Sequence, residues 1–217
     1  MKNHIAPILC LLLALLLNAA WCSGQELKPI QLPQPRMDGG KPLMQALRER
    51  QTLRSFNPEK LPPQTLSDLL WAAFGINRPD SGKRTAPSAR NWQEIDLYVA
   101  MAEGLYLYDA KANTLQPALA RDIRADAGRQ PFVKDAPVVL IFVADYKKMD
   151  DASDSDKMRY SGIDTGFISQ NVYLFCSSED LATVVLGMVN RPALAKTMGL
   201  RPSQQIILSQ PVGKLKK

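Results

Sequence analysis

The sequence contains very little histidine and cysteine. Its one histidine is His4, and Cys176 is the one cysteine of three that lies beyond residue 24. Residues 25–217 therefore exclude a histidine-based triad, a Cys–His pair and a His-rich metal site. Cys176 alone cannot form an internal disulfide, and its apolar surroundings predict a buried structural thiol. If the chain is an enzyme, its chemistry is expected to come from an organic cofactor rather than from catalytic side chains or a metal.

The first 24 residues have the layout of a secretory signal peptide. Lys2 is followed by an apolar run over residues 8–17 and then by small residues. The run is shorter than the roughly 18–20 residues that a membrane span needs. We therefore expect an exported protein in the periplasm. A lipoprotein anchor on Cys22 is the alternative, and the bulky Trp21 before it argues against one.

The remaining chain is of a size that suits one domain with a hydrophobic core. The formal net charge of the full sequence is +6, and its cations are scattered rather than clustered. A solvated surface explains this pattern better than nucleic-acid binding does. We expect an extended N-terminal arm over residues 25–42, because this segment contains four prolines and a Gly-Gly pair. A single folded domain should follow over residues 43–217.

Hydrophobic periodicity and turn residues predict an α+β fold, in which helices flank a central mixed, mainly antiparallel sheet. The apolar run within residues 136–144 predicts a central strand that is buried on both faces. Residues 158–178 predict a long helix that is apolar around much of its circumference, and such a helix is buried in a core or between subunits. Other helices are expected at residues 42–50, 62–75, 119–127 and 192–198, and other strands at 95–101, 104–108, 114–116, 183–186 and 205–208.

An acidic, Ser-rich segment at residues 150–156 predicts an exposed loop. A calcium-binding loop is the alternative, but the segment lacks the glycine and the terminal glutamate spacing of an EF-hand.

Arg50, Thr52 and Arg54 are the first candidates for ligand contacts. Alternate residues of an extended segment point the same way, so the three side chains can face one ligand. Two guanidinium groups and a hydroxyl suit a phosphate and a polar ring edge. The alternative is a solvated helix end, where the helix dipole favours Arg50.

A second candidate is the 86–93 loop, which precedes an apolar strand. Its Ser88, Asn91 and Gln93 offer hydrogen-bonding groups that can recognise the edge of a ring. Taken alone, it is better explained as an ordinary surface loop.

Together these two segments resemble the paired signatures of the nitroreductase family of flavin oxidoreductases. In that family an Arg-x-Ser-x-Arg/Lys segment is followed, about 40 residues later, by a Pro-Ser-x-x-Asn-x-Gln-Pro-Trp loop. The 86–93 loop matches up to Gln93, after which Glu94 and Ile95 replace Pro-Trp. Residues 164–171 resemble the family's long interface helix. Residues 178–183 stand at its Gly-containing turn, with Asp180 replacing Gly, and residues 209–214 stand at its closing segment.

The resemblance implies the nitroreductase fold, a homodimer, and FMN bound at the subunit interface with ping-pong electron transfer through flavin N5. The cofactor contacts that it implies are Arg50, Gln51, Thr52, Arg54, Pro87, Ser88, Ala89, Asn91, Glu179, Asp180, Leu181 and Lys214. No catalytic side chain and no metal are implied. The substrate is expected to be a small molecule, and the electron donor to be NAD(P)H or an exported redox partner. Within the family, the chain resembles the branch related to peptide-azoline oxidases.

Two other functions remain open at this point. One is an exported, non-catalytic flavin- or ligand-binding protein on the same scaffold, which the altered Asp180 and Ser209–Gln210 positions suggest. The other is destruction of the flavin, as in a cobalamin-synthesis relative. No particular residue of the sequence supports this function.

Overall fold

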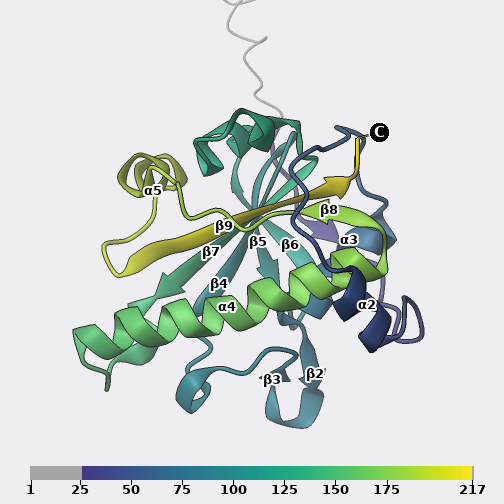
Figure 1. Cartoon of the computed structure of the whole chain (residues 1–217). Helices are drawn as coiled ribbons and strands as arrows, with labels where there is room; N and C mark the ends of the chain where they lie inside the picture. The colour runs from purple at the N-terminus through teal and green to yellow at the C-terminus, as the bar shows by residue number, and fades with distance from the viewer. Residues whose placement is uncertain (1–25, 217) are drawn as a thin grey trace, which may run out of the picture.

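The computed structural model describes residues 26–216, so the predicted signal peptide lies outside the described residues. A seven-stranded sheet in the order β1-β6-β5-β4-β7-β9-β8 forms the centre (Figure 1). The strands are β1 (Ile30–Gln31), β4 (Ile95–Met101), β5 (Gly104–Asp109), β6 (Thr114–Leu119), β7 (Val138–Asp145), β8 (Leu181–Thr183) and β9 (Gln204–Lys214). Every pairing in it is antiparallel, which confirms the α+β class and corrects the expected mixed sheet.

β7 is the central strand that its apolar run predicts. All eight of its residues are buried, and it pairs with β4 on one side and β9 on the other. Successive side chains of a strand point to opposite faces of the sheet. Leu140 and Phe142 accordingly join the core on one face, and Ile141 and Val143 join the core on the other.

Helices cover both faces of the sheet. On one face lie α2 (Leu43–Glu49), α3 (Pro63–Phe74) and the long α4 (Asp154–Ser178), which crosses the sheet with α2 beside its C-terminal end (Figure 1). The other face is covered by α5 (Arg191–Met198) and two 3-10 turns, Arg124–Ala127 and Pro131–Asp135. The hydroxyl of Ser153 accepts a hydrogen bond from Asp156 N, so α4 begins within the segment expected to be a loop.

Several expected bounds differ from the structure. The predicted helix at 119–127 is wrong, because Leu119 pairs with Leu105 at the end of β6 and only Arg124–Ala127 form a short 3-10 turn. The strand expected at 183–186 is β8, which ends at Thr183, and Leu186 makes only an isolated bridge to Ser209. β9 is longer than expected. A small hairpin, β2 (Ile76–Arg78) with β3 (Lys83–Arg84), was not expected.

The N-terminal segment is partly built into the sheet. Ile30 and Gln31 pair with Leu115 and Thr114 of β6, and Leu32 is buried in the core. Within residues 26–216, no helix combines the length and the apolar character needed to cross a membrane.

Candidate functional site

The segment after α2 runs along the edge of the sheet. Leu53 N donates a hydrogen bond to Thr183 O at 3.0 Å, and Asn57 N donates to Lys214 O at 2.9 Å. Phe56 forms a β-bridge with Leu215 and is buried. These backbone contacts place residues 50–57 beside β8 and the end of β9, so the first motif lies next to the residues near 180 and 214.

Tyr173 of α4 organises the first motif. The Arg50 guanidinium lies over its ring, 5.3 Å from the centroid, and Thr52 Oγ1 lies 3.2 Å from its hydroxyl. That hydroxyl also accepts a hydrogen bond from Val185 N at 3.0 Å. Arg54 is exposed. Among the described residues, neither Arg50 nor Arg54 forms an ion pair, so two fixed positive charges remain open to an anionic ligand.

Two adjoining cavities lie in this region. The first has a volume of about 270 Å³ and the second about 740 Å³, and both are lined by Asp180, Leu181 and Leu215. The cofactor contacts that the sequence predicts and that line one or both cavities are Gln51, Glu179, Asp180, Leu181 and Lys214. The Lys214 ammonium is paired with Glu59 at 2.9 Å. The structure therefore brings the first motif and both C-terminal motifs to one place.

Asp180 adopts the left-handed conformation that a glycine would take at this turn. Its φ is +54°, a value that aspartate tolerates better than most residues. Its carboxylate accepts a hydrogen bond from Lys41 Nζ at 2.5 Å, and Lys41 also bonds Glu49 at 3.0 Å. These bonds raise the pKa of Lys41 and lower the pKa of Glu49.

Lys41 and Tyr173 are the residues of this region that the sequence reasoning missed. Lys41 belongs to no motif, and it reaches the turn because its backbone N–H donates to Ser178 Oγ at 2.6 Å. Tyr173 is one of many apolar or aromatic residues on a long helix. Nearby, Cys176 is buried and unpaired with another cysteine, and burial raises the pKa of its thiol, as a structural thiol requires.

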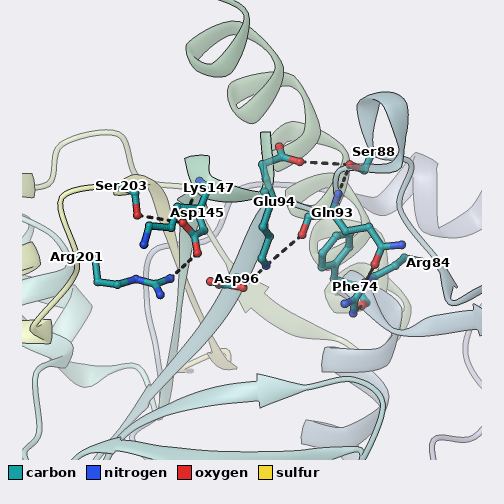
Figure 2. A network of polar contacts seen from close by, with 11 residues as sticks. Phe74, Arg84, Ser88, Gln93, Glu94, Asp96, Asp145, Lys147, Arg201 and Ser203 are labelled. Atoms are coloured by element: carbon teal, nitrogen blue, oxygen red, sulfur yellow. Dashed lines mark hydrogen bonds and ion pairs between the residues drawn. The ribbon is translucent and has the colours of Figure 1, made fainter. Parts of the chain in front are cut away.

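The 86–93 loop is held by a different set of contacts. Ser88 Oγ accepts a hydrogen bond from Gln93 N at 2.8 Å and donates one to Glu94 Oε2 at 3.2 Å (Figure 2). Ala89 N donates to Asp164 Oδ2 of α4 at 2.8 Å. Arg84 Nε donates to Gln93 Oε1 at 2.7 Å, with the guanidinium over the Phe74 ring. The loop is therefore tied to β4, α3 and α4.

Its backbone is unusual. Arg90, Asn91 and Gln93 have φ values of 50°, 59° and 47°, in the left-handed region that residues with a side chain seldom adopt. Such residues persist only where the surroundings fix them, and they cluster at functional sites.

The loop and the first motif lie apart within one chain. The loop contacts α4 at Asp164, whereas the first motif contacts it at Tyr173, nine residues further on. At 1.5 Å per residue this separates them by about 13 Å along the helix. The predicted contacts that line neither cavity are Arg50, Thr52, Arg54, Pro87, Ser88, Ala89 and Asn91. One described chain thus does not bring all twelve predicted contacts together. The described residues also contain no group of three or more side chains suited to a metal ion.

Comparison with known proteins identifies the family. The sequence profile of the nitroreductase family matches residues 47–214. The chain belongs to the nitroreductase family. It is 28% identical over 182 residues to a protein from Methanocaldococcus jannaschii described as a nitroreductase, a match that covers 79% of this chain and 90% of that one.

Solved nitroreductase structures share the fold. The crystal structure of a nitroreductase from Ralstonia eutropha superposes with a TM-score of 0.85 at 40% identity, over 88% of this chain and 91% of that one. A nitroreductase from Desulfovibrio desulfuricans, solved in complex with FMN, gives a TM-score of 0.60 at 22% identity over 82% and 88%. The family and the fold expected from the two motifs are confirmed.

Proposed function

We propose that this chain is an FMN-dependent oxidoreductase whose FMN lies against residues 50–54 and the turn at Asp180. Family membership supports the redox class. The observation that carries the placement is the pair of adjoining cavities, because Gln51 and Leu53 of the first motif line the first cavity and Asp180 lines both. Arg50, which has no acidic partner among the described residues, lies over the ring of Tyr173, which also lines the first cavity.

The residues of this region fit the cofactor. Cofactor sites occupy roughly 300–1,000 Å³, and the two cavities lie within or near that range. Arg50 and Arg54 offer fixed, forked donors to a phosphate or to the negatively charged edge of a reduced ring. The flavin supplies the electron-accepting ring, and the protein supplies position and electrostatic stabilisation. No histidine is needed for either role.

A second copy of the chain is part of the proposal. The outer face of α4 exposes Ile163 and Phe167, which are 45% and 44% exposed, and the neighbouring α2 exposes Leu43, Met44 and Leu47. Together these residues form the α4–α2 face. An apolar face of this kind marks an interaction surface. If two copies of α4 pack antiparallel and cross at residues 168–169, Asp164 of one copy lies level with Tyr173 of the other. The 86–93 loop of each copy would then complete the cofactor site of its partner.

A visible spectrum of the purified protein, before and after addition of FMN, tests the cofactor. We expect a yellow protein, or one that becomes yellow and retains FMN through gel filtration. Arg54→Ala should weaken FMN binding without changing the fold. The matched control Arg121→Ala, at an exposed arginine that lines neither cavity and is paired with Asp126, should leave FMN binding unchanged. A colourless protein that takes up no FMN, or unchanged affinity in Arg54→Ala, contradicts the proposal.

A non-catalytic binding protein is the second candidate. It is favoured by Asp180, whose carboxylate is paired with Lys41 at the edge of both cavities, where the family carries glycine. Turnover distinguishes the two functions. The enzyme would reduce a quinone or a nitroaromatic compound through a ping-pong cycle with NADPH or a reduced electron carrier, whereas the binding protein would hold FMN and turn over neither acceptor.

We also propose export, on the strength of residues 1–24. NAD(P)H is scarce outside the inner membrane, so an exported donor protein would then be the natural source of electrons. Fractionation of cells that produce the full chain, with N-terminal sequencing of the recovered protein, tests this directly. Protein confined to the cytoplasm with residues 1–24 intact would contradict export.

A further inference from the structure

Two carboxyl groups are buried together beneath the 86–93 loop. Glu94, the residue before β4, is 0% exposed, and Asp164 of α4 is 2% exposed. Glu94 Oε2 accepts a hydrogen bond from Ser88 Oγ and Asp164 Oδ2 accepts one from Ala89 N, so the two carboxyl groups hold neighbouring residues of the loop. Within residues 26–216 no lysine or arginine forms an ion pair with either of them. Burying two unpaired negative charges side by side would be very costly.

The surroundings of the pair favour a proton bound to one of the two carboxyl groups. A carboxylate only accepts hydrogen bonds, so two neighbouring carboxylates cannot bond to each other, whereas a protonated carboxyl group can donate to a carboxylate. With both groups ionised, Glu94 Oε1 is buried and has no partner. A shared proton removes both problems. In agreement with this, burial and the neighbouring Asp164 raise the pKa of Glu94 to about 7, and burial raises the pKa of Asp164 as well.

The pair holds the start of the loop. The Ser88 hydroxyl donates a hydrogen bond to Glu94 and accepts one from Gln93 N. Asp164 accepts a hydrogen bond from Ala89 N. The segment between these anchors contains three residues with positive φ, a strained conformation that persists only where the surroundings fix it. The loop therefore depends on its anchors for this conformation.

We propose that Glu94 and Asp164 share one proton and thereby position the 86–93 loop for flavin binding, so that loss of the proton to water releases the loop and weakens the flavin complex. Both are positioning residues, since they act through Ser88 and Ala89. The role in flavin binding rests on the function proposed above, whereas the shared proton does not.

The other charged groups on the surrounding elements are engaged elsewhere. They are Arg84 with Gln93, Arg90 with Asp151, Lys148 with Asp96, Asp145 with Arg201, and Lys157 with Asp154. Contacts with Trp92 and Arg90 lower the pKa of Asp151 further, away from neutrality. We therefore expect titration of the Glu94–Asp164 pair to dominate the behaviour of the loop between pH 6 and pH 8.5.

Trp92 reports on the loop without any ligand. Its indole N–H donates to Asp151, and Trp71 is the one other tryptophan beyond residue 24. In a Trp71→Phe background we expect Trp92 fluorescence to titrate with a midpoint near the pKa of about 7 of Glu94, and Glu94→Gln to abolish the transition. Glutamine keeps an acceptor for Ser88 and gains a donor for Asp164. The ¹³C carboxyl titration of labelled glutamates in the unmodified chain gives the same information if the Trp71 variant folds poorly.

FMN titrations at pH 6 and pH 8 test the consequence. If only the protonated pair holds the loop, FMN binding weakens up to about tenfold between these values. Glu94→Gln should remove this loss, and Glu103→Gln, at an exposed acid paired with Lys60, should keep it. The inference is overturned if FMN affinity depends on pH equally in the unmodified chain and in Glu94→Gln, or if no glutamate titrates near pH 7. Either result leaves the proposed function standing. No FMN binding at any pH overturns the proposed function, and the Trp92 and ¹³C titrations then still decide whether the proton is shared.

Discussion

Replacing Glu94 by glutamine should make the stability of the protein less sensitive to pH. In the unfolded chain Glu94 loses its proton near its ordinary pKa of 4.5, whereas in the folded chain it keeps the proton up to about pH 7. Between these values the folded state binds more protons than the unfolded state, so the free energy of unfolding falls as the pH rises. Glutamine has no proton to lose, so the variant lacks this fall.

The magnitude follows from the two pKa values. A change of one in pKa is worth about 1.4 kcal/mol, so a rise from 4.5 to about 7 corresponds to about 3 kcal/mol at full burial. Near pH 4.5 the variant and the unmodified protein should be nearly equal in stability. Above pH 7 the variant should be more stable by up to about 3 kcal/mol.

Urea unfolding at pH 5, 6, 7 and 8 measures this difference. The exposed Glu103, which is paired with Lys60, provides the matched control. Contact with Lys60 lowers the pKa of Glu103, so Glu103→Gln should show no gain in relative stability over this range. A stability difference between Glu94→Gln and the unmodified protein that stays constant from pH 5 to pH 8 would refute the shared proton.

Three further predictions concern the α4 helix. Phe167→Lys on the α4–α2 face should shift the protein from dimer to monomer in gel filtration, while Met188→Lys, at an exposed apolar residue away from that face, should leave the dimer intact; equal behaviour of the two variants argues against this interface. Tyr173→Phe leaves the Val185 N–H without its partner, so it should cost roughly 1–3 kcal/mol in urea unfolding and weaken FMN binding; loss of stability with unchanged FMN affinity would place the cofactor elsewhere. The Cys176 thiol, buried with a raised pKa, should react with a disulfide reagent at the rate of unfolding, and fast reaction in the native protein would contradict its burial.

Elements with strong local signals could be predicted from the sequence. The Pro62–Pro63 start and the Gly75 stop define α3, and the continuous apolar run of β7 places it at the centre of the sheet. The helix expected at 119–127 failed for a non-local reason. Leu119 pairs with Leu105 of β5, and the residues around Leu119 contain no pattern that predicts this partner.

The same distinction holds for the site. The motifs at residues 50–54 and 178–183 are local, so the sequence identifies their residues, and the sheet edge then brings them together. Lys41 and Tyr173 join them only through the folded chain. Sequence comparison also marked Glu94 as a departure from the family pattern. Its role depends on Asp164, which follows the loop residue Ala89 by 75 positions, and neither residue alone predicts a buried pair.

The two departures from the family's motifs bear on whether the flavin site is intact. Asp180 replaces glycine, yet its backbone adopts the left-handed conformation. Its carboxylate accepts a hydrogen bond from Lys41. Glu94 replaces proline, yet its carboxyl is matched by Asp164 and by the Ser88 hydroxyl. Both substituted side chains are therefore held by specific contacts, which keep the turn and the loop in place. The enzyme and the non-catalytic binding protein both need a site that can hold FMN, so these contacts are compatible with either function and only turnover decides between them.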